Sequence, residues 1–309
     1  MKRILSLAFV IITATTQPLF AQTEPPAIDN EVAEIREFFI AGDYATGFPL
    51  MLPLADAGHP RAQNLIAASY QYGNGVQLDA AQALRYFELA RAQGYPPAMH
   101  NLGVLYEIGM PGVEIDLTRA RNYYAEGAAL GYGPAISGYG AHLMNGTGGP
   151  ADVVNAIRLF QTAAGLGDEL AHEWLGYAYA SAVGVPEDLE RARHHYIVAA
   201  TLGLSSAQNR AGYMLEFGEG GPVDLERAME FYHAAIEQDF ADAGINAAWM
   251  IFDNPDVYPA RIDGLALCYW AVDNATEDRV VEYGSGCEEM AASFSASEQR
   301  QARKAADAL

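Results

Sequence analysis

The chain has 309 residues, 51% of them hydrophobic, and a formal net charge of −21 at pH 7. So acidic a surface repels phosphate backbones and anionic lipids, which argues against nucleic acid as a partner. Beyond the N-terminal run no segment is hydrophobic enough to cross a membrane, so we expect no membrane insertion.

The N-terminus has the pattern of a secretory signal peptide. Two basic residues, Lys2 and Arg3, precede an apolar run over residues 4–12, and Ala21 supplies a small residue at the end. The run is too short to span a bilayer. We expect a signal peptide over residues 1–21, cleaved after Ala21, followed by a linker over residues 22–28. The mature chain is then expected to be periplasmic or secreted.

A repeat of 36 or 37 residues fills the centre of the chain. Its first marker is an alanine, which recurs as Ala62, Ala98, Ala135, Ala171, Ala207 and Ala243. Fixed steps later come a glycine (Gly103, Gly140, Gly176, Gly212), an aspartate (Asp79, Asp116, Asp152, Asp188, Asp224) and, in most copies, an aromatic pair (Tyr86-Phe87, Tyr123-Tyr124, Phe231-Tyr232). Self-similarity at this period is typical of a solenoid of stacked units.

Each copy reads as two helices joined by a glycine-containing loop. Glycines such as Gly73 and Gly75 end the first helix, since they accept positive φ angles without steric cost. The recurring aspartate then precedes the second helix, where aspartate is a preferred N-cap and suits the positive end of the helix dipole. Small residues in both helices let neighbouring helices approach closely.

This pattern resembles the Sel1-like repeat family, which is related to tetratricopeptide repeats. One copy carries the resemblance in Ala98, Leu102-Gly103, Tyr106, Gly109, Gly112-Val113, Asp116, Ala120, Tyr123-Tyr124 and Gly131. The resemblance implies an all-α fold, a right-handed superhelical solenoid of helix-turn-helix repeats used for protein–protein contact. It implies no shared reaction.

The register sets the expected boundaries. Five repeats are predicted, at residues 62–97, 98–134, 135–170, 171–206 and 207–242. Residues 29–61 resemble a degenerate N-terminal repeat or cap, and residues 243–309 a degenerate repeat with a C-terminal helical cap. Terminal repeats diverge because one of their faces meets water.

Cys268 and Cys287 are the only cysteines, and both fall in the C-terminal cap. In an oxidising compartment an isolated pair usually forms a disulfide. The alternative is two free, buried thiols.

The residues that could carry chemistry do not form a recognised motif. His172-Glu173 begins a zincin-like string that has glycine, Gly176, where a second histidine is needed. His194 and His195 are adjacent, so on a helix they point about 100° apart and cannot easily share a metal. The loop Gly146–Gly149 lacks the Gly-Lys-Ser/Thr of a phosphate-binding loop. We therefore predict no catalytic residues, no metal site and no cofactor.

The leading functional hypothesis is a non-catalytic periplasmic scaffold or regulator that binds a peptide or partner segment in a concave groove. In tetratricopeptide relatives one face of each first helix lines this groove, so the resemblance places there Asn64, Gln71, His100, Glu107, Met144, Glu173, Tyr177, Asn209, Tyr213 and Glu216. Tyr177 and Tyr213 are the expected binding anchors; alternatively, both pack against the first helix of the next repeat. Two other functions remain open at this point: a binder or weak hydrolase of cell-wall fragments such as peptidoglycan or β-lactam-like compounds, and a structural spacer.

Overall fold

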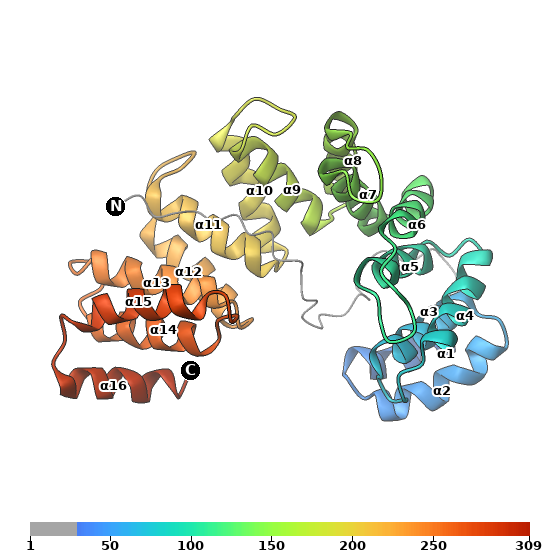
Figure 1. Cartoon of the computed structure of the whole chain (residues 1–309), viewed down its shortest axis with the longest axis horizontal. Helices are drawn as coiled ribbons and strands as arrows, with labels where there is room; N and C mark the ends of the chain where they lie inside the picture. Colours follow the sequence, from blue (N-terminus) through green and yellow to red (C-terminus); the bar gives the residue numbers. More distant parts are fainter. Residues whose placement is uncertain (1–29) are drawn as a thin grey trace. The chain divides into compact units, whose positions relative to one another are not determined.

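The computed structural model describes residues 30–309, and these form two compact units, one ending at Asp116 and the other beginning at Leu117 (Figure 1). Across the described residues the regular elements are sixteen α-helices, with one isolated β-bridge between Met110 and Val113. The all-α repeat fold predicted from the sequence is confirmed. The predicted signal peptide and linker lie outside the described residues.

The first unit contains five helices, in the order α1 (Asn30–Ile40), α2 (Tyr44–Asp56), α3 (Pro60–Tyr72), α4 (Ala80–Ala92) and α5 (Pro96–Ile108). Consecutive helices pack against each other throughout. The predicted N-terminal cap corresponds to α1 and α2, and Asp43 caps α2 by accepting a hydrogen bond from the backbone N–H of Thr46 at 3.1 Å.

The second unit contains α6 (Leu117–Ala129), α7 (Gly133–Asn145), α8 (Val153–Gly165), α9 (Glu169–Ala180), α10 (Leu189–Thr201), α11 (Ser205–Phe217), α12 (Leu225–Ile236), α13 (Ala241–Asp253), α14 (Arg261–Asp273), α15 (Val280–Ala291) and α16 (Ala296–Ala306). Helices α7 and α8, α9 and α10, α11 and α12, and α13 and α14 form packed pairs. In each pair the odd-numbered helix is the first helix of a repeat.

The recurring glycine of the first helix makes room for an aromatic ring of the second helix. A Cβ on Gly140 would lie 2.7 Å from the Phe160 ring, and one on Gly212 would lie 2.7 Å from the Tyr232 ring. Both rings are fully buried. In these two repeats glycine stands at this step because the two helices pack too closely for a Cβ beside the aromatic ring.

Four of the five recurring aspartates form the predicted N-cap bond. Asp79, Asp152, Asp188 and Asp224 each accept a hydrogen bond at 3.0–3.1 Å from the backbone N–H three residues later. Each bond satisfies one of the donors that a helix leaves unpaired at its N-terminus. This local role accounts for the recurrence of these four aspartates.

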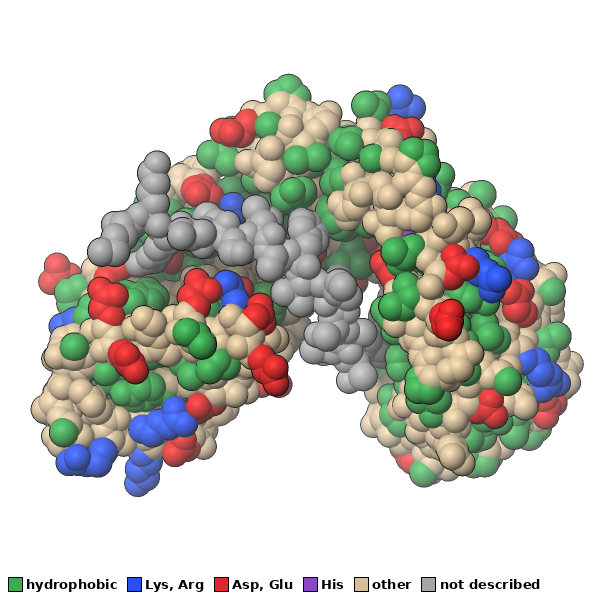
Figure 2. Space-filling view, viewed as in Figure 1, with side chains coloured by type: hydrophobic (Ala, Val, Ile, Leu, Met, Phe, Trp, Pro, Cys, Tyr) green, Lys and Arg blue, Asp and Glu red, His purple; other side chains and the backbone are tan. Residues whose placement is uncertain are grey.

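The C-terminal cap contains the predicted disulfide. Cys268 of α14 and Cys287 of α15 are both buried and bonded to each other, with Cα atoms 5.6 Å apart. No helix within residues 30–309 is long and apolar enough to span a membrane. On the face visible in Figure 2, acidic and hydrophobic side chains are interspersed over both units.

Candidate partner-binding surface

In the second unit, three consecutive first helices carry a large aromatic side chain at the same position of the repeat. Tyr177 of α9, Tyr213 of α11 and Trp249 of α13 each lie six residues after the recurring alanine. All three side chains are half-buried. We refer to these three residues as the aromatic row.

The two tyrosines of the row differ in their surroundings. Tyr177 packs edge-on against Trp174 and lies against the apolar clusters on both sides of α9. Tyr213 contacts Phe217 at 4.6 Å between ring centroids, and the guanidinium of Arg210 lies 5.2 Å from its ring centroid. Phe217 is 45% exposed. Phe217 therefore extends the row at Tyr213 with an exposed aromatic side chain.

Trp249 closes the row on the side of the C-terminal cap. Its indole nitrogen would lie 3.6 Å from a Cβ on Gly286 of α15, so α15 packs beside it. Phe252 packs edge-on against Trp249, and the Arg261 guanidinium lies 4.0 Å from the Phe252 ring centroid. This end of the row is a packed aromatic–cation cluster.

Charged groups flank the row. Burial raises the pKa of the Glu173 carboxyl, and a hydrogen bond with Ser206 partly opposes that rise. Arg210 forms an ion pair with Glu219 at 3.7 Å. A basic or hydroxyl-bearing group of a partner that paired with Glu173 would offset the cost of burying its charge.

Four of the residues predicted to line the groove are buried: Asn64, Gln71, Met144 and Glu216. Glu216 accepts a hydrogen bond from the buried Tyr232 hydroxyl at 2.8 Å, and Asn64 accepts one from Asn101 at 2.9 Å. We interpret these four as packing residues, because a partner cannot reach them without local rearrangement.

The other six predicted residues are half-buried: His100, Glu107, Glu173, Tyr177, Asn209 and Tyr213. Glu173 of α9 reaches α11 through its hydrogen bond with Ser206, whereas His100 and Glu107 belong to the first unit. Asn209 accepts a hydrogen bond from Asn246 of the following first helix at 2.9 Å, repeating the Asn64–Asn101 contact. It therefore joins neighbouring repeats.

Sequence reasoning missed Trp249 and Phe217. Trp249 falls in a degenerate copy that was grouped with the cap, although counting from Ala243 places it in register with Tyr177 and Tyr213. Phe217 is the last residue of α11, one position beyond Glu216, the last residue predicted for the groove in that helix. The same register therefore held a signal for Trp249.

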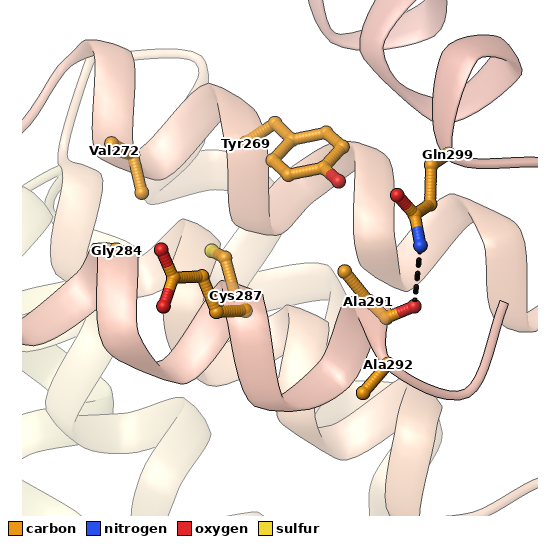
Figure 3. Close-up of a pocket in the computed structure, with 8 residues that line it drawn as sticks. Tyr269, Val272, Gly284, Cys287, Ala291, Ala292 and Gln299 are labelled. Carbon is orange, nitrogen blue, oxygen red and sulfur yellow. Dashed lines mark hydrogen bonds between the residues drawn. The ribbon is translucent and has the colours of Figure 1, made fainter. Parts of the chain in front are cut away.

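The C-terminal cap also has a cavity of about 420 Å³ between α14, α15 and α16 (Figure 3). It is lined by Tyr269, Val272, Gly284, Cys287, Glu288, Ala291, Ala292 and Gln299. The Gln299 amide already donates to the backbone oxygens of Ala291 and Phe294. The cavity has no group arranged for catalysis: Cys287 is in the disulfide and Glu288 is exposed.

The profile of the Sel1 repeat matches the sequence five times, at residues 60–95, 96–132, 133–168, 170–204 and 205–240. No curated protein matches the chain at a significant level.

Solved structures show the same fold. A Sel1 repeat protein from Oxalobacter formigenes has 24% sequence identity and a TM-score of 0.61, over 85% of this chain and 97% of that one. A protective antigen of uropathogenic Escherichia coli with an SLR fold has 23% identity and a TM-score of 0.62, over 90% of this chain and 60% of that one. An immunity protein from Pseudomonas aeruginosa has 18% identity and a TM-score of 0.53, over 71% of this chain and 84% of that one.

Proposed function

The chain belongs to the Sel1 repeat family, whose members generally act as non-catalytic protein-interaction scaffolds, and we propose that it is an exported scaffold or regulator that binds a segment of a partner protein along the aromatic row. The observation that carries this proposal is the recurrence of Tyr177, Tyr213 and Trp249 at one repeat position with their side chains half-buried. Aromatic side chains that present both apolar area and a polar atom are frequent anchors of protein interfaces.

The side chains in and beside the aromatic row indicate the chemistry of the partner segment. Tyr213 and Phe217 offer apolar contact area. Glu173 offers a carboxyl whose charged form is disfavoured by burial. An acidic chain attracts basic partners over distances of about a Debye length. The partner segment is therefore one with apolar side chains interspersed with basic or hydroxyl groups.

Export is part of the proposal, and it rests on the basic, apolar and small-residue pattern of residues 1–21. The disulfide supports it, since disulfides persist mainly in oxidising compartments. N-terminal sequencing of protein from the periplasmic fraction should begin at Gln22. Recovery of an uncleaved chain from the cytoplasm would contradict export.

A photo-crosslinking amino acid at position 177 or 213 tests the surface directly in cells that express the full chain. We expect the same partner to be captured from both positions and not from position 166, where Leu166 is 53% exposed at the end of α8. Equal capture from position 166 would place the interface elsewhere.

Affinity measurements with the captured partner then separate binding from packing. The double variant Tyr177→Ala with Tyr213→Ala should weaken binding at least tenfold, about 1.4 kcal/mol, with a small change in melting temperature. A large loss of stability would identify the tyrosines as core residues, and unchanged affinity with unchanged stability would exclude them from the interface.

A further inference from the structure

The fourth repeat contains a pair of histidines that the repeat pattern does not require. His172 occupies the position of Gln63 and Gln208, and His195 the position of Tyr86 and Phe231. Those repeats pack without histidine at either position. The two histidines lie on different helices, α9 and α10, which bring their rings together.

The two rings meet through their Nδ1 atoms, which are 3.0 Å apart. Tyr179 stacks on His195 with an interplanar angle of 3°, which restricts the orientation of that ring. The His172 ring is held by a hydrogen bond to the backbone oxygen of Ala164. Gln63 and Gln208 make the corresponding bond to Ala55 and Ala200.

The bond to Ala164 determines which nitrogen of His172 is free of a proton. Because Nδ1 faces His195, we assign the bond to Nε2–H, which leaves a lone pair on Nδ1. Histidines that bind metals commonly donate their other N–H to a backbone carbonyl in this way. His172 is thus oriented as a ligand is in known metal sites.

Both rings are neutral at neutral pH. Burial lowers the pKa of His172, and burial together with the neighbouring His172, His194 and Arg191 lowers the pKa of His195 to about 4. If the His195 proton moves from Nδ1 to Nε2, both Nδ1 lone pairs become available with no net release of protons.

We propose that His172 and His195 form a binding site for a divalent transition-metal ion such as Cu²⁺, Ni²⁺ or Zn²⁺, held by the two Nδ1 atoms and completed by water. Metal–nitrogen bonds of about 2.0–2.1 Å at square-planar or tetrahedral angles put two ligand nitrogens about 2.8–3.4 Å apart. The observed 3.0 Å lies in this range. Imidazole nitrogens favour these ions over Mg²⁺ and Ca²⁺, which prefer oxygen.

The donor set predicts modest affinity. Among residues 30–309 no group of three or more His, Cys, Asp or Glu side chains is arranged to hold a metal. The protein therefore supplies two ligands, and water would have to fill the other positions. Within this family of ions, Cu²⁺ should bind most tightly.

The test is a titration of the full, untagged chain with CuCl2 and NiCl2, compared with MgCl2. We expect one equivalent of Cu²⁺ to bind, with hyperfine coupling to two nitrogens in its electron paramagnetic resonance spectrum. His172→Gln and His195→Phe restore residues found in other repeats, so both should fold with near-normal melting temperatures while weakening Cu²⁺ binding at least tenfold. His194→Gln is the matched control, since His194 is exposed and adjacent.

Four results would overturn the proposal. The first three are the absence of saturable Cu²⁺ binding, affinity for Mg²⁺ equal to that for Cu²⁺, and wild-type affinity in both single variants. The fourth is equal weakening by His194→Gln, because the ligands would then not be the facing Nδ1 atoms.

Discussion

The regular repeats from α7 to α12 and the cap from α13 to α16 stabilise the same kind of helix pair by different means. In the repeats, Asp152, Asp188 and Asp224 cap the second helices. In the cap, the corresponding second helix, α14, has no side-chain N-cap bond, whereas α16 has a capping box formed by Ser295 and Glu298. A disulfide joins α14 to α15 instead.

Specific polar pairs add to the disulfide. Asp242 of α13 accepts a hydrogen bond from the Tyr283 hydroxyl and pairs with Arg279 at 3.3 Å, while Asp273 pairs with Arg303 of α16 at 2.8 Å. The comparison indicates that helix pairs of the regular repeats are stabilised by contacts that recur from copy to copy. In the cap, where the repeat pattern degenerates, a single disulfide and individual polar pairs take the place of those contacts.

Removing the disulfide should give the largest effect. The double variant Cys268→Ala with Cys287→Ala should lose about 3 kcal/mol of stability, since the bond closes a loop of about twenty residues in the unfolded chain. Hydrogen exchange should increase in α14 to α16 and stay unchanged in α7 to α10. Adding a reductant to the double variant is the control and should change nothing. Uniform loosening of the whole unit would show that the cap does not depend on its own cross-link.

Adding a side chain at the recurring glycine should destabilise a repeat that has no disulfide. Gly212→Val should cost about 2 kcal/mol by overpacking, because a Cβ there already lies 2.7 Å from the buried Tyr232 ring. Chemical denaturation measures the loss. The matched variant is Gly165→Val in α8, where a Cβ meets nothing within 4 Å, and its stability should change by less than about 0.5 kcal/mol. Equal losses of stability in Gly212→Val and Gly165→Val would mean that helix propensity, and not packing against Tyr232, accounts for the effect.

Removing an N-cap from a repeat helix and adding one to a helix of the cap test the comparison from both sides. Asp224→Ala should cost about 1 kcal/mol, and Ala260→Ser should add a cap to α14 and gain about 0.5–1 kcal/mol. Melting curves of the two single variants should therefore shift in opposite directions. A neutral Asp224→Ala would show that the second helices do not depend on their N-caps.

The smallest effect expected depends on pH. Asp168 is buried at the start of α9, where it accepts hydrogen bonds from the Ser137 hydroxyl at 2.6 Å and the Ala171 N–H at 3.0 Å. Burial nevertheless raises its pKa, and those two bonds oppose the rise only in part. The folded state therefore takes up a proton at a higher pH than the unfolded state does, and stability is gained as the pH falls through the raised pKa.

Asp168→Asn should consequently be more stable than the wild type at pH 7.5, by less than about 1 kcal/mol. The difference should shrink as the pH is lowered, which melting curves of both proteins from pH 7.5 to 4.5 would measure. A difference that does not vary with pH would show that the charge of Asp168 is not responsible.

The repeating contacts were predictable because each depends on one residue type at one step. Asp188 could be identified as an N-cap, and Cys268 with Cys287 as a disulfide, from local sequence and composition alone. The approach of His172 to His195 was not predictable in this way. It depends on how α9 packs on α10, which brings together residues 23 positions apart on different helix faces.

The candidate binding face was only partly predictable for the same reason. The register placed both residues on the predicted face, but it could not distinguish Met144, which neighbouring side chains bury, from Tyr213, which they leave half-exposed. Burial depends on the sizes of the residues facing each position, and those vary from copy to copy.

The asparagine pairs restrict how a protein of this kind can grow by duplication. Asn64 of α3 and Asn101 of α5 belong to neighbouring copies, and both amides are buried. A new repeat inserted between these copies would separate the pair and leave a buried amide without its partner, at a cost of about 1–3 kcal/mol. Duplications that keep these neighbours together avoid that cost, so the order of the copies at this junction, as well as their number, affects stability.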